Sequence, residues 1–148
     1  MEDRIASGFI GGIIAGIAMN IIDWIGYSLG FYNERLLDWA SIAIYGHLPI
    51  TNYEVVFAQL GQIFFSGFAG ILFSYMLLKL TSGNYLLKGW IFGILMWFGL
   101  YATSIALRLP TLTNHDFHTS LAHFISSTVY GLVLASVLNY LDKRKVLG

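Results

Sequence analysis

The chain of 148 residues contains no cysteine, so disulfide bonds, thiolate zinc sites and cysteine nucleophiles are all excluded. Charged residues are scarce as well, at 11 % against roughly 25 % in an ordinary soluble domain. The eight basic and eight acidic residues give a formal net charge of zero, so the charge balance does not indicate a nucleic-acid partner. Hydrophobic residues make up 57 %. A chain this apolar cannot cover its whole surface with polar residues that contact water, which indicates an integral membrane protein in a lipid bilayer.

Four apolar runs reach or exceed the roughly 20 residues needed to cross a bilayer core. They cover residues 5–29, 55–80, 86–107 and 119–141. The first run is not typical of a signal peptide, because its start, MEDR, is acidic as well as basic and no clear cleavage site follows. The sequence therefore predicts an all-α protein with one domain over residues 1–148, built as a bundle of four transmembrane helices.

The connection between the first two runs predicts one further helix, over residues 33–47. Asn33 is its expected N-cap, apolar residues recur at helical spacing, and Gly46 and Pro49 end it. Because this amphipathic helix is too short to span and contains Trp39, we expect it at the outer membrane interface.

The second and third runs are joined by residues 81–85 alone, a turn rich in residues that tolerate unusual backbone angles. So short a connection predicts that these two helices are antiparallel neighbours.

The placement of Lys and Arg predicts the orientation, since cytoplasmic loops carry an excess of both. With both termini in the cytoplasm, six of these residues lie inside and two outside. The inner ones are Arg4, Lys79, Lys88, Lys143, Arg144 and Lys145, and the outer ones are Arg35 and Arg108. All four histidines then lie on the outer side.

Small residues four positions apart predict close helix packing, because they let helix backbones approach one another within a bilayer. The first run has a doubled GxxxG pattern, and the second and third runs have glycines on their probable packing faces. The packing glycines are Gly8, Gly12, Gly16, Gly70, Gly89 and Gly93. We expect these faces also to associate copies of the chain into a homo-oligomer.

Polar residues gather in the outer half of the predicted helices, whereas the inner half is small and apolar. At about 1.5 Å per residue, Asp23 lies close to the outer boundary of a ~30 Å core, and His123 lies about one turn inside it. The residues expected to line one outward-facing cavity are Asn20, Asp23, Gln59, Gln62, Ser104, Arg108, His123 and Ser127. No polar row continues inward, so a constitutive pore through one subunit is not expected.

Asp23 is the strongest single candidate, because an acid within a span usually faces protein or water and has a partner. Arg108 is its expected partner; the alternative is that Arg108 anchors the chain at the interface. Two other acids have a structural explanation, since residues 51–54 (TNYE) and 113–116 (TNHD) both match a capping box at a helix start.

Residues 114–123, NHDFHTSLAH, hold three of the four histidines. His115 and His118 are three apart and would share a helix face, which makes them candidate ligands of a divalent metal; the alternatives are interfacial polarity and acid sensing. His47, Asp116 or Glu54 could complete such a shell. His123 lies deeper, and either contacts Asp23 or a ligand or is satisfied within the bundle. No catalytic residue and no other cofactor is assigned.

Several segments carry a family resemblance: the first run GFIGGIIAGIAMNIID, the outer segment GHLP, and the second run GQIFFSGFAGIL. The resemblance continues in the segments LLKGWIFGILMW and RLP, and in a last run with an early histidine followed by YGLVLA. The chain resembles the small bacterial inner-membrane proteins of the YagU and YqhR type. The resemblance implies a bacterial cytoplasmic membrane and four helices, and it implies no agreed activity and no catalytic residues.

The leading interpretation is a non-enzymatic membrane protein whose cavity binds a small ligand, ion or proton for sensing or transport. One alternative is a structural or accessory subunit that binds a membrane-protein partner and no ligand. A second is a membrane-embedded enzyme in which His123 and Asp23 form an acid–base pair.

Overall fold

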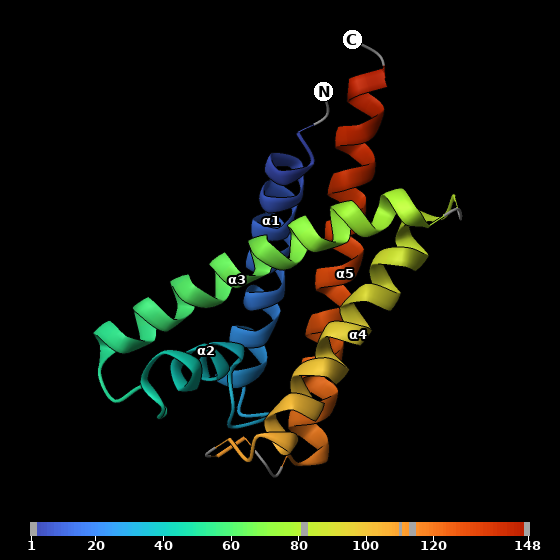
Figure 1. Cartoon of the computed structure of the whole chain (residues 1–148). Coiled ribbons are helices and arrows are strands. Elements are labelled where there is room, and N and C mark those ends of the chain that lie inside the picture. Colours follow the sequence, from blue (N-terminus) through green and yellow to red (C-terminus); the bar gives the residue numbers. More distant parts are fainter. Residues whose placement is uncertain (1–2, 81–82, 110, 113–114, 147–148) are drawn as a thin grey trace.

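A computed structural model describes residues 3–80, 83–109, 111–112 and 115–146, which form helices and connections without a β-strand. The helices are α1 (Arg4–Ser28), α2 (Leu36–Tyr45), α3 (Asn52–Lys79), α4 (Tyr85–Ala106) and α5 (Phe117–Val146). Both termini lie at one end, and the α1–α2 and α4–α5 connections lie at the other (Figure 1). We call these the termini end and the histidine end.

Polar side chains begin the long helices. Asp3 accepts a hydrogen bond from the N–H of Ala6, Asn84 from that of Leu87, and Asp116 from that of Thr119. These caps satisfy N–H groups that the first helical turn leaves without a partner.

The capping box of residues 51–54 is confirmed. Thr51 Oγ1 accepts from the N–H of Glu54, and Glu54 Oε2 accepts from the N–H of Thr51. In the second predicted box, Thr113 lies outside the described residues, and Asp116 caps α5 directly. Hydrogen bonding to Thr119 holds the pKa of Asp116 below its usual range.

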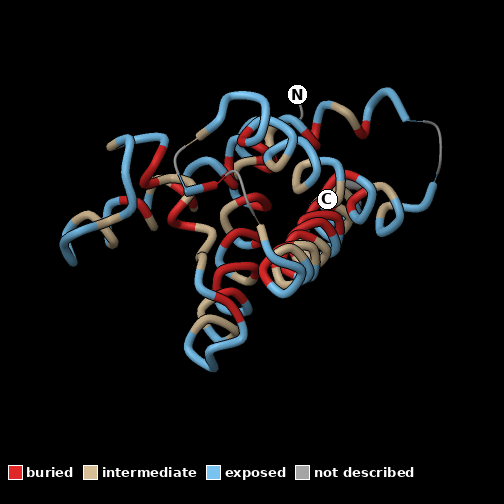
Figure 2. The backbone as a smooth tube through the Cα atoms, turned by 90° about the horizontal axis from the view of Figure 1, so that it is seen from below, coloured by how far each residue is buried: buried red, intermediate tan, exposed pale blue. Residues whose placement is uncertain are grey.

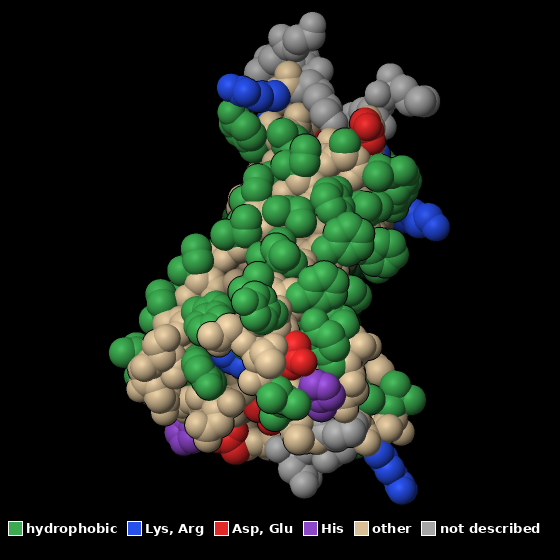
Figure 3. All heavy atoms as spheres, turned by 90° about the vertical axis from the view of Figure 1, so that its left-hand side faces the viewer, with side chains coloured by type: hydrophobic (Ala, Val, Ile, Leu, Met, Phe, Trp, Pro, Cys, Tyr) green, Lys and Arg blue, Asp and Glu red, His purple; other side chains and the backbone are tan. Residues whose placement is uncertain are grey.

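The prediction of four long apolar helices in an all-α chain is confirmed. α1, α3, α4 and α5 are long and apolar enough to cross a membrane, whereas α2 has only ten residues. Figure 3 shows hydrophobic side chains over the middle of one face, with the histidine side chains on this face at the histidine end and acidic side chains at both ends. Large apolar side chains such as Ile14 and Phe68 are exposed along these helices.

α1 and α3 cross with their backbones in direct contact. A Cβ atom added to Gly12 would overlap the carbonyl oxygen of Ser66, and one added to Gly70 would overlap the backbone of Gly8 and Gly12. At Gly16 it would overlap the side chain of Ser66. Because no other residue lacks a Cβ, this crossing requires glycine.

α4 and α5 form a second pair of the same kind. A Cβ on Gly89 would overlap the carbonyl oxygen of Gly131, and one on Gly93 would overlap that of Ser127. The glycine faces are therefore occupied within a single chain. A second copy would have to use another surface.

The prediction that α3 and α4 pack as neighbours is wrong for most of their length. α3 packs on α1 and α4 on α5, while α3 and α4 hardly contact each other. Their clearest contact is between the rings of Phe73 and Phe92, with centroids 5.0 Å apart. Beyond it, α3 crosses over α1 and diverges from α4 (Figure 1). The short turn joins two helix ends, but the glycine contacts set the directions of both helices.

α2 packs on α3 on the side where α3 and α4 diverge. It begins at Leu36 and not at Asn33, because the N–H of Arg35 donates to Asp38 Oδ2 at 2.7 Å and so closes the first turn. It ends as expected at Gly46, whose φ of 77° is easily adopted by glycine. Leu37, Asp38, Ser41 and Ile42 are buried, so α2 is part of the packed structure.

The apolar core runs between α1, α3, α4 and α5. It includes Phe73 of α3, Phe92 of α4, and Leu134 and Leu138 of α5. Figure 2, seen from the histidine end, shows buried residues on the sides of the helices that face one another.

We expect Gly12→Leu to lower the free energy of unfolding by about 1–3 kcal/mol or more, because the new side chain would overlap the backbone of α3. Thermal unfolding in mild detergent measures the change. Gly99→Leu is the matched control, since a Cβ on Gly99 of α4 has nothing within 4 Å. Equal destabilisation by both substitutions would contradict the close crossing.

Candidate functional site

A row of side-chain amides ties α1 to α3. Asn20 Nδ2 donates to the carbonyl oxygen of Gly16 at 2.7 Å and to Gln62 Oε1 at 2.5 Å. Gln59 Nε2 donates to Asn20 Oδ1 at 2.8 Å, and Trp24 Nε1 donates to Gln59 Oε1 at 2.8 Å. We call Asn20, Gln59 and Gln62 the amide row. Its members are hydrogen-bonded mainly to one another and to α1.

Asp23 is completely buried near the histidine end of α1. Its Oδ2 accepts from the backbone N–H of Leu36 at 2.9 Å, and its Oδ1 lies 3.1 Å from the hydroxyl of Tyr32. That hydroxyl also donates to the backbone carbonyl of Asp23 at 2.6 Å. The carboxylate thus binds the α1–α2 connection to α1. Burial raises the pKa of the Tyr32 hydroxyl, so Tyr32 stays a neutral donor.

His123 of α5 joins three parts of the chain. Its ring is 1 % exposed, and its Nε2 lies 3.2 Å from the carbonyl oxygen of Glu34 and 3.7 Å from Asp23 Oδ1. Its Nδ1 lies 2.8 Å from the hydroxyl of Tyr101 on α4. The histidine therefore connects α4, α5 and the segment that follows α1.

The predicted partnership of Asp23 with Arg108 is not found. Arg108 follows the end of α4 with a φ of 49°, is exposed, and makes no recorded hydrogen bond or ion pair with Asp23. Arg35 is paired with a different acid: its guanidinium lies 2.9 Å from Asp38 Oδ1 and also covers the ring of Tyr27.

His115 and His118 do not share a helix face, because α5 begins only at Phe117. His115 Nδ1 lies 3.2 Å from Glu34 Oε2 and its ring stacks on Trp39, whereas His118 is exposed beside Phe117. Among the described residues, no three His, Asp or Glu side chains are placed to hold a metal ion. Burial raises the pKa of the Glu34 carboxyl, and His115 opposes the shift.

The other groups considered from the sequence have local partners. His47 Nδ1 lies 2.7 Å from the carbonyl oxygen of Leu48, and its ring stacks on Tyr45. Ser104 is buried and donates to the carbonyl oxygen of Tyr101 at 2.8 Å.

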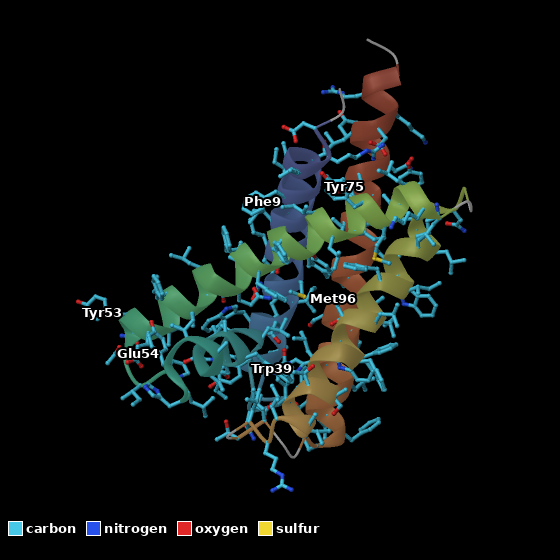
Figure 4. All side chains as sticks on the ribbon, in the orientation of Figure 1. Phe9, Trp39, Tyr53, Glu54, Tyr75 and Met96 are labelled. Atoms are coloured by element: carbon cyan, nitrogen blue, oxygen red, sulfur yellow. The ribbon has the colours of Figure 1, made fainter. Side chains whose placement is uncertain are left out.

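A cavity of about 480 Å³ lies where α3 and α4 diverge, and α2, α3, α4 and α5 supply most of its walls. Figure 4 labels two of its lining residues, Trp39 on α2 and Met96 on α4. Phe64, Phe65 and Phe68 of α3 line it and are also exposed, so it opens at the side of the bundle. Most of the lining is apolar.

The polar lining side chains are Gln62 and Ser66 of α3, Tyr101 and Thr103 of α4, and His123, Ser127 and Tyr130 of α5. No Asp, Glu, Lys or Arg belongs to the lining within the described part of the chain. The cavity therefore offers neutral hydrogen-bonding groups and a large apolar surface.

Apart from Arg108, the predicted ligand-binding residues fall into two sets. Gln62, His123 and Ser127 line the cavity, while Asn20, Asp23 and Gln59 lie behind this lining and hold it in place. The polar groups thus form two clusters, one around Asn20 and one around Asp23 and His123, but the open space beside them is mainly apolar.

Sequence reasoning missed Tyr32, Glu34 and Tyr101, which complete the contacts of Asp23 and His123. The only available signal was that the α1–α2 connection, residues 29–35, begins less than two helical turns after Asp23. It also missed a second cluster at the termini end, where Asp142 accepts from Arg4 at 3.1 Å and from the hydroxyl of Tyr85 at 3.0 Å.

The fold and site define an all-α protein with four helices able to cross a membrane and a cavity between diverging helices. The chain belongs to the family described as "Family of unknown function (DUF6789)", whose model matches residues 2–147. No curated protein and no solved structure matches it.

We expect Asn20→Ala to lower the free energy of unfolding by about 1–3 kcal/mol, because Gln59 Nε2 and Gln62 Oε1 would lose a buried partner. Chemical or thermal unfolding in detergent measures the change. Asn52→Ala, at an exposed position at the start of α3, is the control and should change stability little. If both variants were equally stable, the amide row would not hold α1 to α3.

Proposed function

We propose that this protein is a small membrane protein that binds an uncharged, amphiphilic small molecule in the cavity between α2, α3, α4 and α5, for sensing or as part of transport. The observation that carries the proposal is the cavity itself. It has apolar walls, and its polar side chains come from three different helices. Ligand sites typically combine an apolar lining with a few convergent polar groups in this way.

The absence of charged side chains from the described lining narrows the ligand. A buried phosphate, carboxylate or ammonium group needs a partner of opposite charge, because a charge removed from water without one costs many kcal/mol. Two acidic and basic side chains described above, Asp23 and Arg35, are engaged with Leu36 and Asp38 respectively. An uncharged head group avoids this cost, so a neutral molecule fits better than the ion also expected from the sequence.

The position of the opening supports an apolar tail on the ligand. Phe64 and Phe68 lie in the middle of α3, within its apolar length, and are exposed at the cavity. In a bilayer this opening would face hydrocarbon chains, so a ligand dissolved in the membrane could enter from the side.

The structural alternative has one observation in its favour. The amide row and Asp23 are hydrogen-bonded within the chain, as expected if they only join helices. Such an accessory subunit would bind a membrane-protein partner and leave the cavity without a small molecule. The enzymatic alternative would use the contact between His123 and Asp23.

We also propose that the chain lies in a bacterial cytoplasmic membrane with both termini in the cytoplasm. The resemblance to the YagU and YqhR type supports the membrane, and the excess of Lys and Arg at the termini end supports the orientation. The histidine end and the nearby cavity would then lie toward the outer side.

A brominated amphiphile tests the ligand proposal, since bromine quenches nearby tryptophan and two of the four tryptophans, Trp39 and Trp97, line the cavity. We expect a dibromostearoyl monoglyceride, which is neutral, to quench the protein in nanodiscs saturably. At equal bromine content it should quench more strongly than dibromostearoyl phosphatidylcholine.

Two variants make the measurement specific. Ala43→Phe places a ring at an exposed lining position of α2 and should abolish the extra quenching. Ala102→Phe adds the same ring to an exposed position of α4 outside the lining and should leave the quenching unchanged. If the wild type and both variants were quenched alike, the accessory-subunit alternative would be preferred.

The orientation can be tested with single cysteines, because the chain has none of its own. Asn33→Cys lies in the α1–α2 connection and Gly83→Cys between α3 and α4; both positions are exposed. In bacterial spheroplasts, a membrane-impermeant maleimide should label the cysteine at 33 directly and the one at 83 only after permeabilisation. The reverse pattern would place the termini outside.

A further inference from the structure

We infer that the ligand of this cavity carries a hydroxyl group on a flat ring, with the hydroxyl donating to Tyr101 and an oxygen accepting from Gln62. This inference rests on the proposed function and names the chemical class of its ligand, a neutral phenol-type or quinol-type molecule. It follows from the directions of the hydrogen bonds behind the cavity wall and from the aromatic side chains within it.

The amide row determines which end of Gln62 faces the cavity. Trp24 Nε1 can only donate, so the atom of Gln59 that it meets is an oxygen, and Gln59 therefore presents its amide nitrogen to Asn20. The carbonyl oxygen of Gly16 can only accept, so Asn20 presents its own amide nitrogen to Gly16 and Gln62. The contacts at both ends of the amide row therefore require the same assignment of amide nitrogen and oxygen atoms.

Gln62 consequently uses Oε1 within the row. Its Nε2, with two N–H donors, has no recorded hydrogen bond to a described residue, and the side chain lines the cavity. The wall formed by α3 thus offers a donor, which calls for an acceptor oxygen on the ligand.

The opposite wall has the reverse polarity. The carbonyl oxygen of Glu34 can only accept, so Nε2 of His123 carries a proton. An uncharged imidazole with its proton on Nε2 accepts at Nδ1, and the hydroxyl of Tyr101 must therefore donate to it. With its proton directed at His123, the Tyr101 oxygen can only accept. The side chain of Ser120 is one partner of this hydroxyl, and the remaining acceptor position calls for an O–H group on a ligand.

The aromatic side chains that line the cavity suit a flat ring. Trp39 of α2 and Tyr101 of α4 are stacked, with centroids 5.3 Å apart, and Trp97 lies 5.2 Å from Tyr101. All three line the cavity together with Phe64 and Phe65. Rings packed at such distances gain contact energy beyond area burial. The indole N–H of Trp39 is buried without a hydrogen-bond partner among the described residues, as a further donor on this side.

The test compares 1-naphthol with 1-methoxynaphthalene. Both have the same ring with an oxygen at the same position, but the ether oxygen of 1-methoxynaphthalene carries no O–H donor. Equilibrium dialysis against nanodiscs holding the full chain measures binding, and nanodiscs holding Ala43→Phe give the background from partition into lipid. We expect the wild type to prefer 1-naphthol at least tenfold. Tyr101→Phe should reduce this preference to about onefold, while binding of 1-methoxynaphthalene persists.

Gln62→Met serves as the second variant, because it removes the donor that both probes use. It should weaken both probes and leave the preference for 1-naphthol intact. Two results would overturn the inference while leaving the proposed function in place. One is equal binding of the two probes by the wild type, and the other is a preference for 1-naphthol that survives in Tyr101→Phe. Binding of neither probe above the Ala43→Phe background would overturn the inference; if the brominated monoglyceride also failed to quench, the proposed function would fail with it.

Discussion

The structure depends on backbone-to-backbone contact at two helix crossings. Gly12 and Gly70 bring α1 against α3, and Gly89 and Gly131 bring α4 against α5. Helices in a bilayer gain little from burying apolar surface against each other, since the lipid is equally apolar, and they associate through close packing and hydrogen bonds. The glycines permit that closeness in two separate pairs. The pairs then meet along α1 and α5.

This pairing explains why a cavity exists at all. α3 follows α1 and α4 follows α5, so the two helices that share a short turn separate from one another beyond Phe73 and Phe92. α2 lies against α3 at the opening without filling it. The cavity is thus a consequence of helix direction, and α2 and α5 complete walls that are formed mainly by the diverging parts of α3 and α4.

The polar cluster at the histidine end stabilises this arrangement and also gives the cavity its chemistry. Asn20, Asp23 and Gln59 are fully or partly buried and bonded within the chain, and a buried polar group without such partners would be costly. Asn20 orients Gln62, and Asp23 lies 3.7 Å from His123; both Gln62 and His123 line the cavity. Gln62 and Tyr101, which is held by His123, therefore present defined hydrogen-bonding groups and not freely rotating ones.

The helices could be predicted from local features of the sequence. Long apolar runs, capping residues such as Thr51 with Glu54, and the helix-ending Gly46 all act over short distances along the chain. The sequence also indicated which glycines would meet other helices and that polar residues gather at one end. Which helices pair was decided only by the tertiary structure, because a short turn between α3 and α4 constrains their ends and not their directions. The partners of Asp23 and His123 were likewise unpredictable: Tyr32, Glu34 and Tyr101 lie on other segments, and a hydrogen bond depends on where those segments are packed and not on spacing along the chain.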